Sequence, residues 1–92
     1  MSAALSALVL SACQKPLSAE ECSALLDRYT ELLAGTEGRS PSAEEILRLQ
    51  REARARAARS PEFARCTDEI SRSQWECAMR APTADEIEKC LL

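Results

Sequence analysis

The sequence predicts an all-α domain: a small disulfide-stapled bundle of about four to five short helices (two long, two to three short). Ala, Leu, Glu and Arg dominate the 92 residues and only two Gly occur, a composition that favours helix. Apolar residues recur at helical spacing behind Ser or Thr residues that are followed three positions later by Glu or Gln. Five Cys accompany only one Trp, one Tyr and one Phe. A domain with so few large core residues usually needs additional stabilisation, for example by disulfides.

The first long helix is expected over residues 18–34. Ser18 and Glu21 have the spacing of a capping box, in which each side chain satisfies a backbone amide of the other residue. The apolar stripe behind them consists of Cys22, Leu25, Leu26, Tyr29, Leu32 and Leu33. Gly35 and Gly38 then end the helix and free the chain to turn.

The second long helix is expected to start at Ser42, with Glu45 completing the same box, and to end at Ser60-Pro61. Its inward residues are Ile46, Leu49, Ala53 and Ala57. Pairs four residues apart, Glu44 with Arg48 and Glu52 with Arg56, are expected on its surface.

Short helices should follow, with no strand anywhere. Pro61 is placed to be the first helical residue behind Ser60, and Ser71 and Thr83 are expected to cap the next two helices. Inward residues in this region are Phe63, Cys66, Ile70, Trp75, Ala78, Met79, Ile87, Cys90 and Leu91. Trp75 is expected to anchor the core; the alternative is an exposed aromatic residue used in recognition.

Residues 1–13 end in Leu10-Ser11-Ala12-Cys13, which resembles a bacterial lipobox. The uncharged run from Ala3 to Ala12 is too short to span a bilayer, and its length suits a signal peptide. The resemblance implies removal of residues 1–12, diacylation of Cys13, a lipidated tether over 13–17 and a single domain over 18–92. Because Gln14 follows the cysteine in place of Asp, lipobox signals of this kind imply the outer membrane. No Lys or Arg precedes the apolar run, so the alternative is a buried helix with Cys13 in the core of a cytosolic protein.

Cys22, Cys66, Cys77 and Cys90 are an even number in a small exported chain and predict two disulfides. An antiparallel pair of long helices brings Cys66 back towards Cys22, while Cys77 and Cys90 flank the turn at Pro82. This favours the pairs Cys22–Cys66 and Cys77–Cys90, with Cys22–Cys90 and Cys66–Cys77 as the alternative. A zinc site would need closely spaced ligand pairs and a redox site C-x-x-C; both patterns are absent from the sequence, as is His.

Cys66, the Ser-Gln-Trp-Glu-Cys-Ala stretch at 73–78, Ala81 and the Ile87-x-x-Cys90 ending are similar to small four-cysteine lipoproteins of myxobacterial type. The resemblance covers residues 60–92 together with the lipobox. It implies export and disulfide bonding, and it brings no catalytic residue.

Charge is unevenly placed along the chain, whose net charge is −3. The first long helix is acidic, whereas the second carries five arginines: Arg48, Arg51, Arg54, Arg56 and Arg59. These arginines predict either a patch for an anionic partner, since the guanidinium group binds phosphate oxygens in pairs, or a solvated helix face. The adjacent carboxylates Asp68-Glu69 and Asp85-Glu86 lie near helix starts, where the helix dipole accounts for them.

The sequence therefore predicts no enzyme, no cofactor and no small-molecule substrate, and its net acidity argues against nucleic acid as a partner. We expect an exported, lipid-anchored envelope protein that acts as a binding or structural module, with a membrane contact through its lipid and an unidentified envelope protein as partner. The alternatives are a small inhibitor or immunity-type partner of an envelope enzyme, and a cytosolic helical protein with free thiols.

Overall fold

The computed structural model describes residues 15–36 and 38–92, and in this part of the chain six helices and no strand are present. The helices are α2 (Ala19–Ala34), α3 (Ala43–Ala57), α4 (Pro61–Ala64), α5 (Cys66–Glu69), α6 (Arg72–Arg80) and α7 (Ala84–Cys90). The predicted all-α, disulfide-stapled fold is confirmed.

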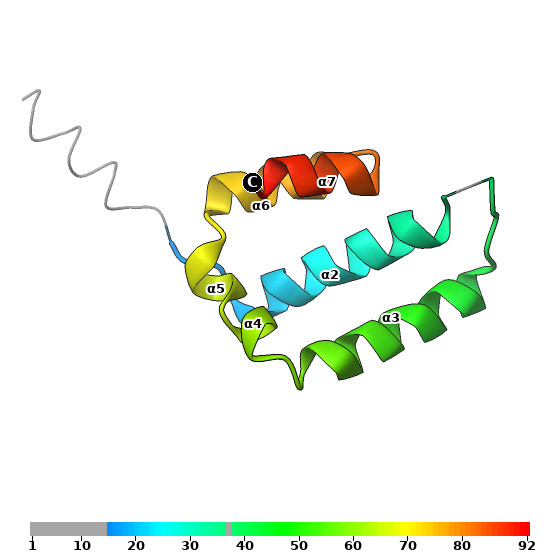
Figure 1. Ribbon diagram of the computed structural model, residues 1–92, viewed down its shortest axis with the longest axis horizontal. Coiled ribbons are helices and arrows are strands. Elements are labelled where there is room, and N and C mark those ends of the chain that lie inside the picture. Colours follow the sequence, from blue (N-terminus) through cyan, green and yellow to red (C-terminus); the bar gives the residue numbers. More distant parts are fainter. Residues whose placement is uncertain (1–14, 37) are drawn as a thin grey trace, which may run out of the picture.

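The long helix α2 lies in the middle of the molecule (Figure 1). Helix α3 runs antiparallel to it on one side, and the hairpin of α6 and α7 lies on the other side. The short helices α4 and α5 sit at the end of the molecule where α2 begins. Because α2 contacts α3, α5, α6 and α7, it organises the whole fold.

Side-chain caps begin the helices where the sequence predicts them. Ser18 and Ser71 form complete capping boxes; the Ser18 hydroxyl accepts the Glu21 amide at 3.1 Å, and the Glu21 carboxylate accepts the Ser18 amide at 3.0 Å. The side chains of Ser42, Ser60 and Thr83 each accept the amide three residues on. At the other end of α2, Gly38 has a φ of 72°, which favours glycine in the turn towards α3.

The third expected helix differs from the prediction because it divides into α4 and α5. Arg65 (φ −84°, ψ −2°) lies between them, and its amide donates to the Glu62 carbonyl three residues back, which closes α4. No side chain caps α5. Counting the two turns separately gives six helices where four to five were expected.

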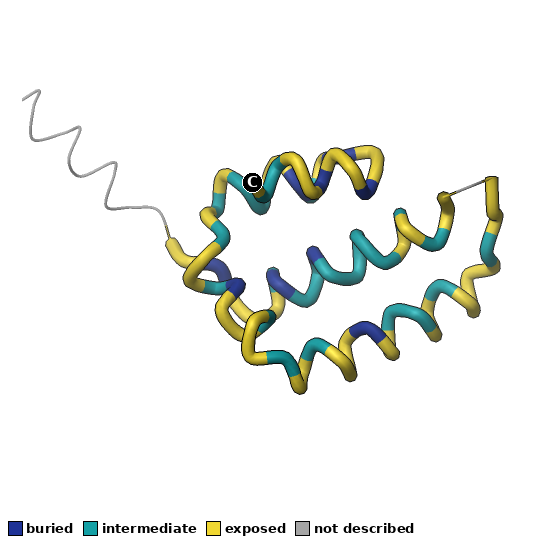
Figure 2. Tube along the Cα trace, in the orientation of Figure 1, coloured by how far each residue is buried: buried dark blue, intermediate teal, exposed yellow. Residues whose placement is uncertain are grey.

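The core consists of two small clusters that share their neighbours. One contains Leu25, Ala78, Ala81 and Ile87, and the other contains Leu17, Cys22 and Cys66. Trp75 and Ile70 are half-buried and pack against both clusters, so Trp75 has the core role expected of it. Figure 2 shows how few positions are buried along the long helices, and Ile87, which is 1 % exposed, is the most deeply buried large side chain among the described residues.

Candidate functional site

Cys13, the predicted lipidation residue, lies outside the described residues. The other four cysteines form two disulfides, Cys22–Cys66 with a Cα–Cα distance of 6.3 Å and Cys77–Cys90 with 5.7 Å. This is the pairing favoured from the sequence, and the alternative pairing is not the one present. The first disulfide fastens α5 to the start of α2 within the core, and the second joins α6 to α7 across their turn.

The five arginines predicted as an anion patch are spread around α3 and its C-terminal end. Arg54 donates two hydrogen bonds to the Asp27 carboxylate of α2, one of them 2.9 Å long. Arg48 pairs with Glu52 at 3.0 Å, which replaces the expected pairs Glu44–Arg48 and Glu52–Arg56. Arg51, Arg56 and Arg59 are exposed, with no ion pair to another described residue. The five side chains therefore do not come together in one anion site, and Arg54 instead holds α3 against α2.

A groove of largely apolar side chains runs along α2 between its neighbours. One hollow of about 290 Å³ lies between α2, α4, α5 and α7, and a second of about 380 Å³ lies between α2 and α3. The two share Leu26, Tyr29 and Phe63, none of which is fully buried, and we refer to the joined hollows as the groove. Leu33, which lines the second hollow, is 45 % exposed, so the apolar stripe of α2 is only partly covered by the fold.

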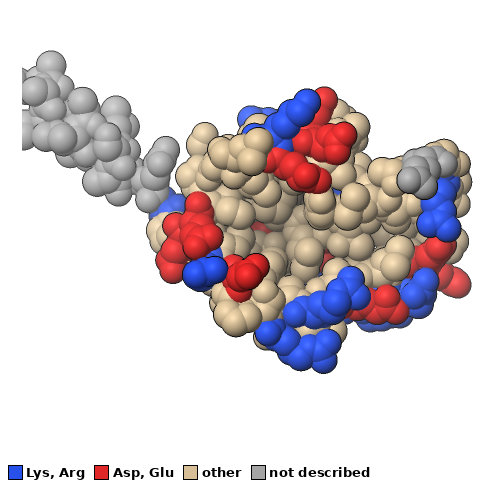
Figure 3. All heavy atoms as spheres, in the orientation of Figure 1, with Lys and Arg blue, Asp and Glu red and all other residues tan. Residues whose placement is uncertain are grey.

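The two hollows of the groove differ in charge. Glu62, Glu69 and Glu88 line the first, which holds no Lys or Arg; we call it the acidic half. Arg56 is the one charged residue lining the second, the basic half. Figure 3 shows acidic groups at the α5 and α7 edges of the central hollow and a group of basic side chains at the C-terminal end of α3.

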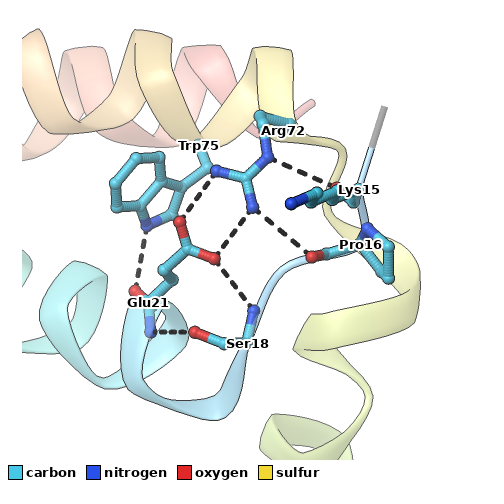
Figure 4. A network of polar contacts seen from close by, with 6 residues as sticks. All are labelled: Lys15, Pro16, Ser18, Glu21, Arg72 and Trp75. Carbon is cyan, nitrogen blue, oxygen red and sulfur yellow. Dashed lines mark hydrogen bonds and ion pairs between the residues drawn. The ribbon is translucent and has the colours of Figure 1, made fainter. Parts of the chain in front are cut away.

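The residues before α2 are held against the fold. Leu17 is 3 % exposed and packs in the cluster with the Cys22–Cys66 disulfide. The Arg72 guanidinium donates to the carbonyls of Lys15 at 3.3 Å and Pro16 at 3.4 Å (Figure 4). Residues 15–17, which belong to the expected tether over 13–17, are therefore docked against the helices.

Arg72 also joins this segment to the first turn of α2. It donates to both carboxylate oxygens of Glu21, at 2.8 and 2.9 Å, and lies over the Trp75 ring at 5.9 Å from the ring centre. The Trp75 indole in turn donates to the Glu21 carbonyl at 2.9 Å (Figure 4). The hydrogen bonds from Arg72, followed by the hydrogen bond from the Ser18 amide, stabilise the carboxylate and lower the pKa of Glu21 from 4.5 to about 2.

Sequence reasoning missed Arg72 and Arg28, and no local signal marks either residue. Arg28 donates to the Ala81 carbonyl at 3.1 Å and joins α2 to the end of α6. Both contacts span more than 50 positions in the chain, and they become visible only when the helices are packed.

Comparison with protein-family models, curated proteins and solved structures finds no match to this chain. Within residues 15–36 and 38–92, none of the helices has the length and hydropathy of a membrane-spanning segment. The same part of the chain contains no cluster of His, Cys, Asp or Glu suited to a metal ion.

Proposed function

We propose that this chain is an exported envelope protein, anchored by lipid on Cys13, that works as a binding or structural module and not as an enzyme. The observation that carries the proposal is the docked segment behind the lipobox. Only Gln14 separates Cys13 from Lys15, whose carbonyl accepts from Arg72. An anchor at Cys13 would hold the α2 start, α5 and α6 directly beside the membrane.

The disulfides support the export part of the proposal. Four of the five cysteines are paired, and such bonds persist in oxidising compartments such as the periplasm. If Cys13 is the lipid site, each cysteine has a role and no thiol is left over. Two or more acyl chains would make the attachment stable, whereas one chain binds membranes only marginally.

The groove supports the binding part of the proposal. It leaves Leu33, Leu26 and Phe63 incompletely covered in a chain whose core is already small. Apolar patches with a charged rim are typical of interaction surfaces. The charged side chains with the most extensive contacts, Glu21 and Arg72, hold helices together, which is a structural task.

The mass of the intact protein isolated from native membranes tests the anchor. We expect a mass that lacks residues 1–12, includes acyl chains and is lower by the four hydrogens lost in two disulfides. Cys13→Ser serves as the control and should leave the chain unacylated. A wild-type mass that retains residues 1–12 with five reactive thiols would contradict the proposal and favour the cytosolic alternative.

Fractionation tests the proposed outer-membrane location. Because Gln14 carries that expectation, Gln14→Asp should move the acylated protein to the inner membrane with its fold unchanged. If wild type and Gln14→Asp were distributed equally between the two membranes, the proposed outer-membrane location would be contradicted. The lipid anchor would still be tested separately by the mass measurement.

A further inference from the structure

The two halves of the groove are complementary to one another. The acidic half lies between α2, α7 and the short helices α4 and α5, so its α7 edge carries Glu88, and the basic half lies on the α3 side of α2. Both halves are lined mainly by apolar side chains, and Leu26, Tyr29 and Phe63 are common to both. A second copy of this chain therefore offers a matching surface for each half, apolar in the middle and of opposite charge at the edge.

The charge pattern selects one symmetry axis. A two-fold axis along α2, in the plane of the groove, turns the second copy so that its basic half faces the acidic half of the first. Arg56 of each copy then faces the α7 edge of the acidic half of the other copy, where Glu88 lies. An in-plane axis across α2 instead sets acidic half against acidic half, and like charges placed together cost binding free energy.

The same axis suits attachment to one membrane. The docked segment enters the fold at the end where α2 begins (Figure 1), and a rotation about an axis along α2 keeps both entering segments at that end. The crosswise axis would place them at opposite ends. Charge and anchoring thus favour the same arrangement.

We propose that the groove is the self-complementary interface of a two-fold symmetric dimer of this chain, in which the acidic half of each copy receives the basic half of the other. Such an interface is isologous, so the assembly closes at two copies and does not extend into a filament. The pairing rests on the groove itself; only the common orientation towards the membrane rests on the proposed anchor.

Sedimentation equilibrium of the full chain in a density-matched detergent measures the association. We expect a dimer for the wild type and about tenfold weaker association for Arg56→Glu and for Glu88→Arg. The double variant exchanges the two charges between the halves and should recover most of the association. Arg51→Glu is the matched control, because Arg51 is an exposed residue of the same helix that lines neither half of the groove.

The proposal would be overturned by a monomeric wild-type chain, by equal weakening from Arg51→Glu, or by a double variant that associates no better than either single one. A monomer would leave the groove to another occupant, such as a basic amphipathic helix of a different protein. Cys13→Ser separates this inference from the anchor. A dimer that persists without acylation supports the groove interface, whereas a dimer found only with the acylated protein contradicts it.

Discussion

Glu21 is the residue whose charge ties the entering segment to the bundle. Its carboxylate accepts two hydrogen bonds from Arg72 and one from the Ser18 amide, so it belongs both to a helix cap and to an ion pair between helices. Removing its charge would therefore weaken the contact between α2 and α6 as well as the start of α2.

The lowered pKa of Glu21 makes this contribution depend on pH. The carboxyl titrates at about 2 in the folded chain and near 4.5 otherwise, so its stabilisation is complete above 4.5 and is lost as the pH falls towards 2. Urea midpoints of wild type and Glu21→Gln should differ at neutral pH and converge over this interval. A difference that stays constant down to about 2 would show that the charge of Glu21 does not stabilise the fold.

The contacts of Arg72 require a guanidinium group, so we expect that lysine does not replace it without loss. Its planar guanidinium reaches both oxygens of Glu21 and the carbonyls of Lys15 and Pro16, whereas a lysine ammonium is a single point charge. We expect Arg72→Lys to speed hydrogen exchange of the Ser18 amide several-fold and to leave exchange in α3 unchanged. Arg80→Lys, at the exposed end of the same helix, is the control, and equal effects of the two variants would contradict a specific role for Arg72.

At the scale of helices, the two disulfides should differ in what they contribute. Cys22–Cys66 spans 44 positions and Cys77–Cys90 spans 13, and the loop-entropy relation gives about 4 and 3 kcal/mol respectively. The longer link also lies in the core beside Leu17, where Cys22 is 2 % exposed. Its loss therefore removes packing as well as a constraint on the unfolded chain.

Paired alanine variants measure this difference. We expect Cys22→Ala/Cys66→Ala to lower the free energy of unfolding by about 4 kcal/mol or more, and Cys77→Ala/Cys90→Ala by about 3 kcal/mol. Thermal unfolding followed by circular dichroism gives both values. The reverse order of stability would show that the short hairpin, and not the core link, holds the bundle together.

Local patterns predicted the helices well, because a cap needs only a residue and the amides three positions on. Ser18, Ser42 and Ser71 all cap the helices expected of them. The disulfide pairing followed from the same helix order, since an antiparallel pair of long helices returns the chain to its start. The break at Arg65 was missed because a backbone turn there has no cap or proline to mark it.

Local sequence patterns did not predict the groove, for a different reason. The stripe on α2 predicts an apolar face, but periodicity does not say how much of that face the other helices cover. Leu25 is buried under α6 and α7, while Leu33 on the same stripe is 45 % exposed because the fold covers it only in part. How far the stripe is covered depends on the lengths and angles of the other helices, and these are set by contacts such as Arg28 with Ala81.

For the whole molecule, the docked segment and the proposed anchor together fix an orientation. Trp75 bonds to the first turn of α2, near the entering segment, whereas Leu47 lies near the start of α3, at the far end of the antiparallel pair (Figure 1). Leu47 lies ten residues before the C-terminal end of α3, which is beside the start of α2, and a helix rises about 1.5 Å per residue. The two positions therefore differ in height by about 15 Å if α2 stands along the membrane normal.

Energy transfer from tryptophan to acceptor-labelled lipid headgroups measures this height. In vesicles carrying the acylated protein, we expect strong transfer from Trp75, the only tryptophan of the chain. The variant Trp75→Phe/Leu47→Trp moves the donor to an exposed position and should show much weaker transfer, with circular dichroism confirming that it remains helical. Equal transfer from the two positions would mean that the domain lies flat or tumbles on its anchor. In that case the bonds from Arg72 to the Lys15 and Pro16 carbonyls do not hold the entering segment when the protein is attached to a membrane.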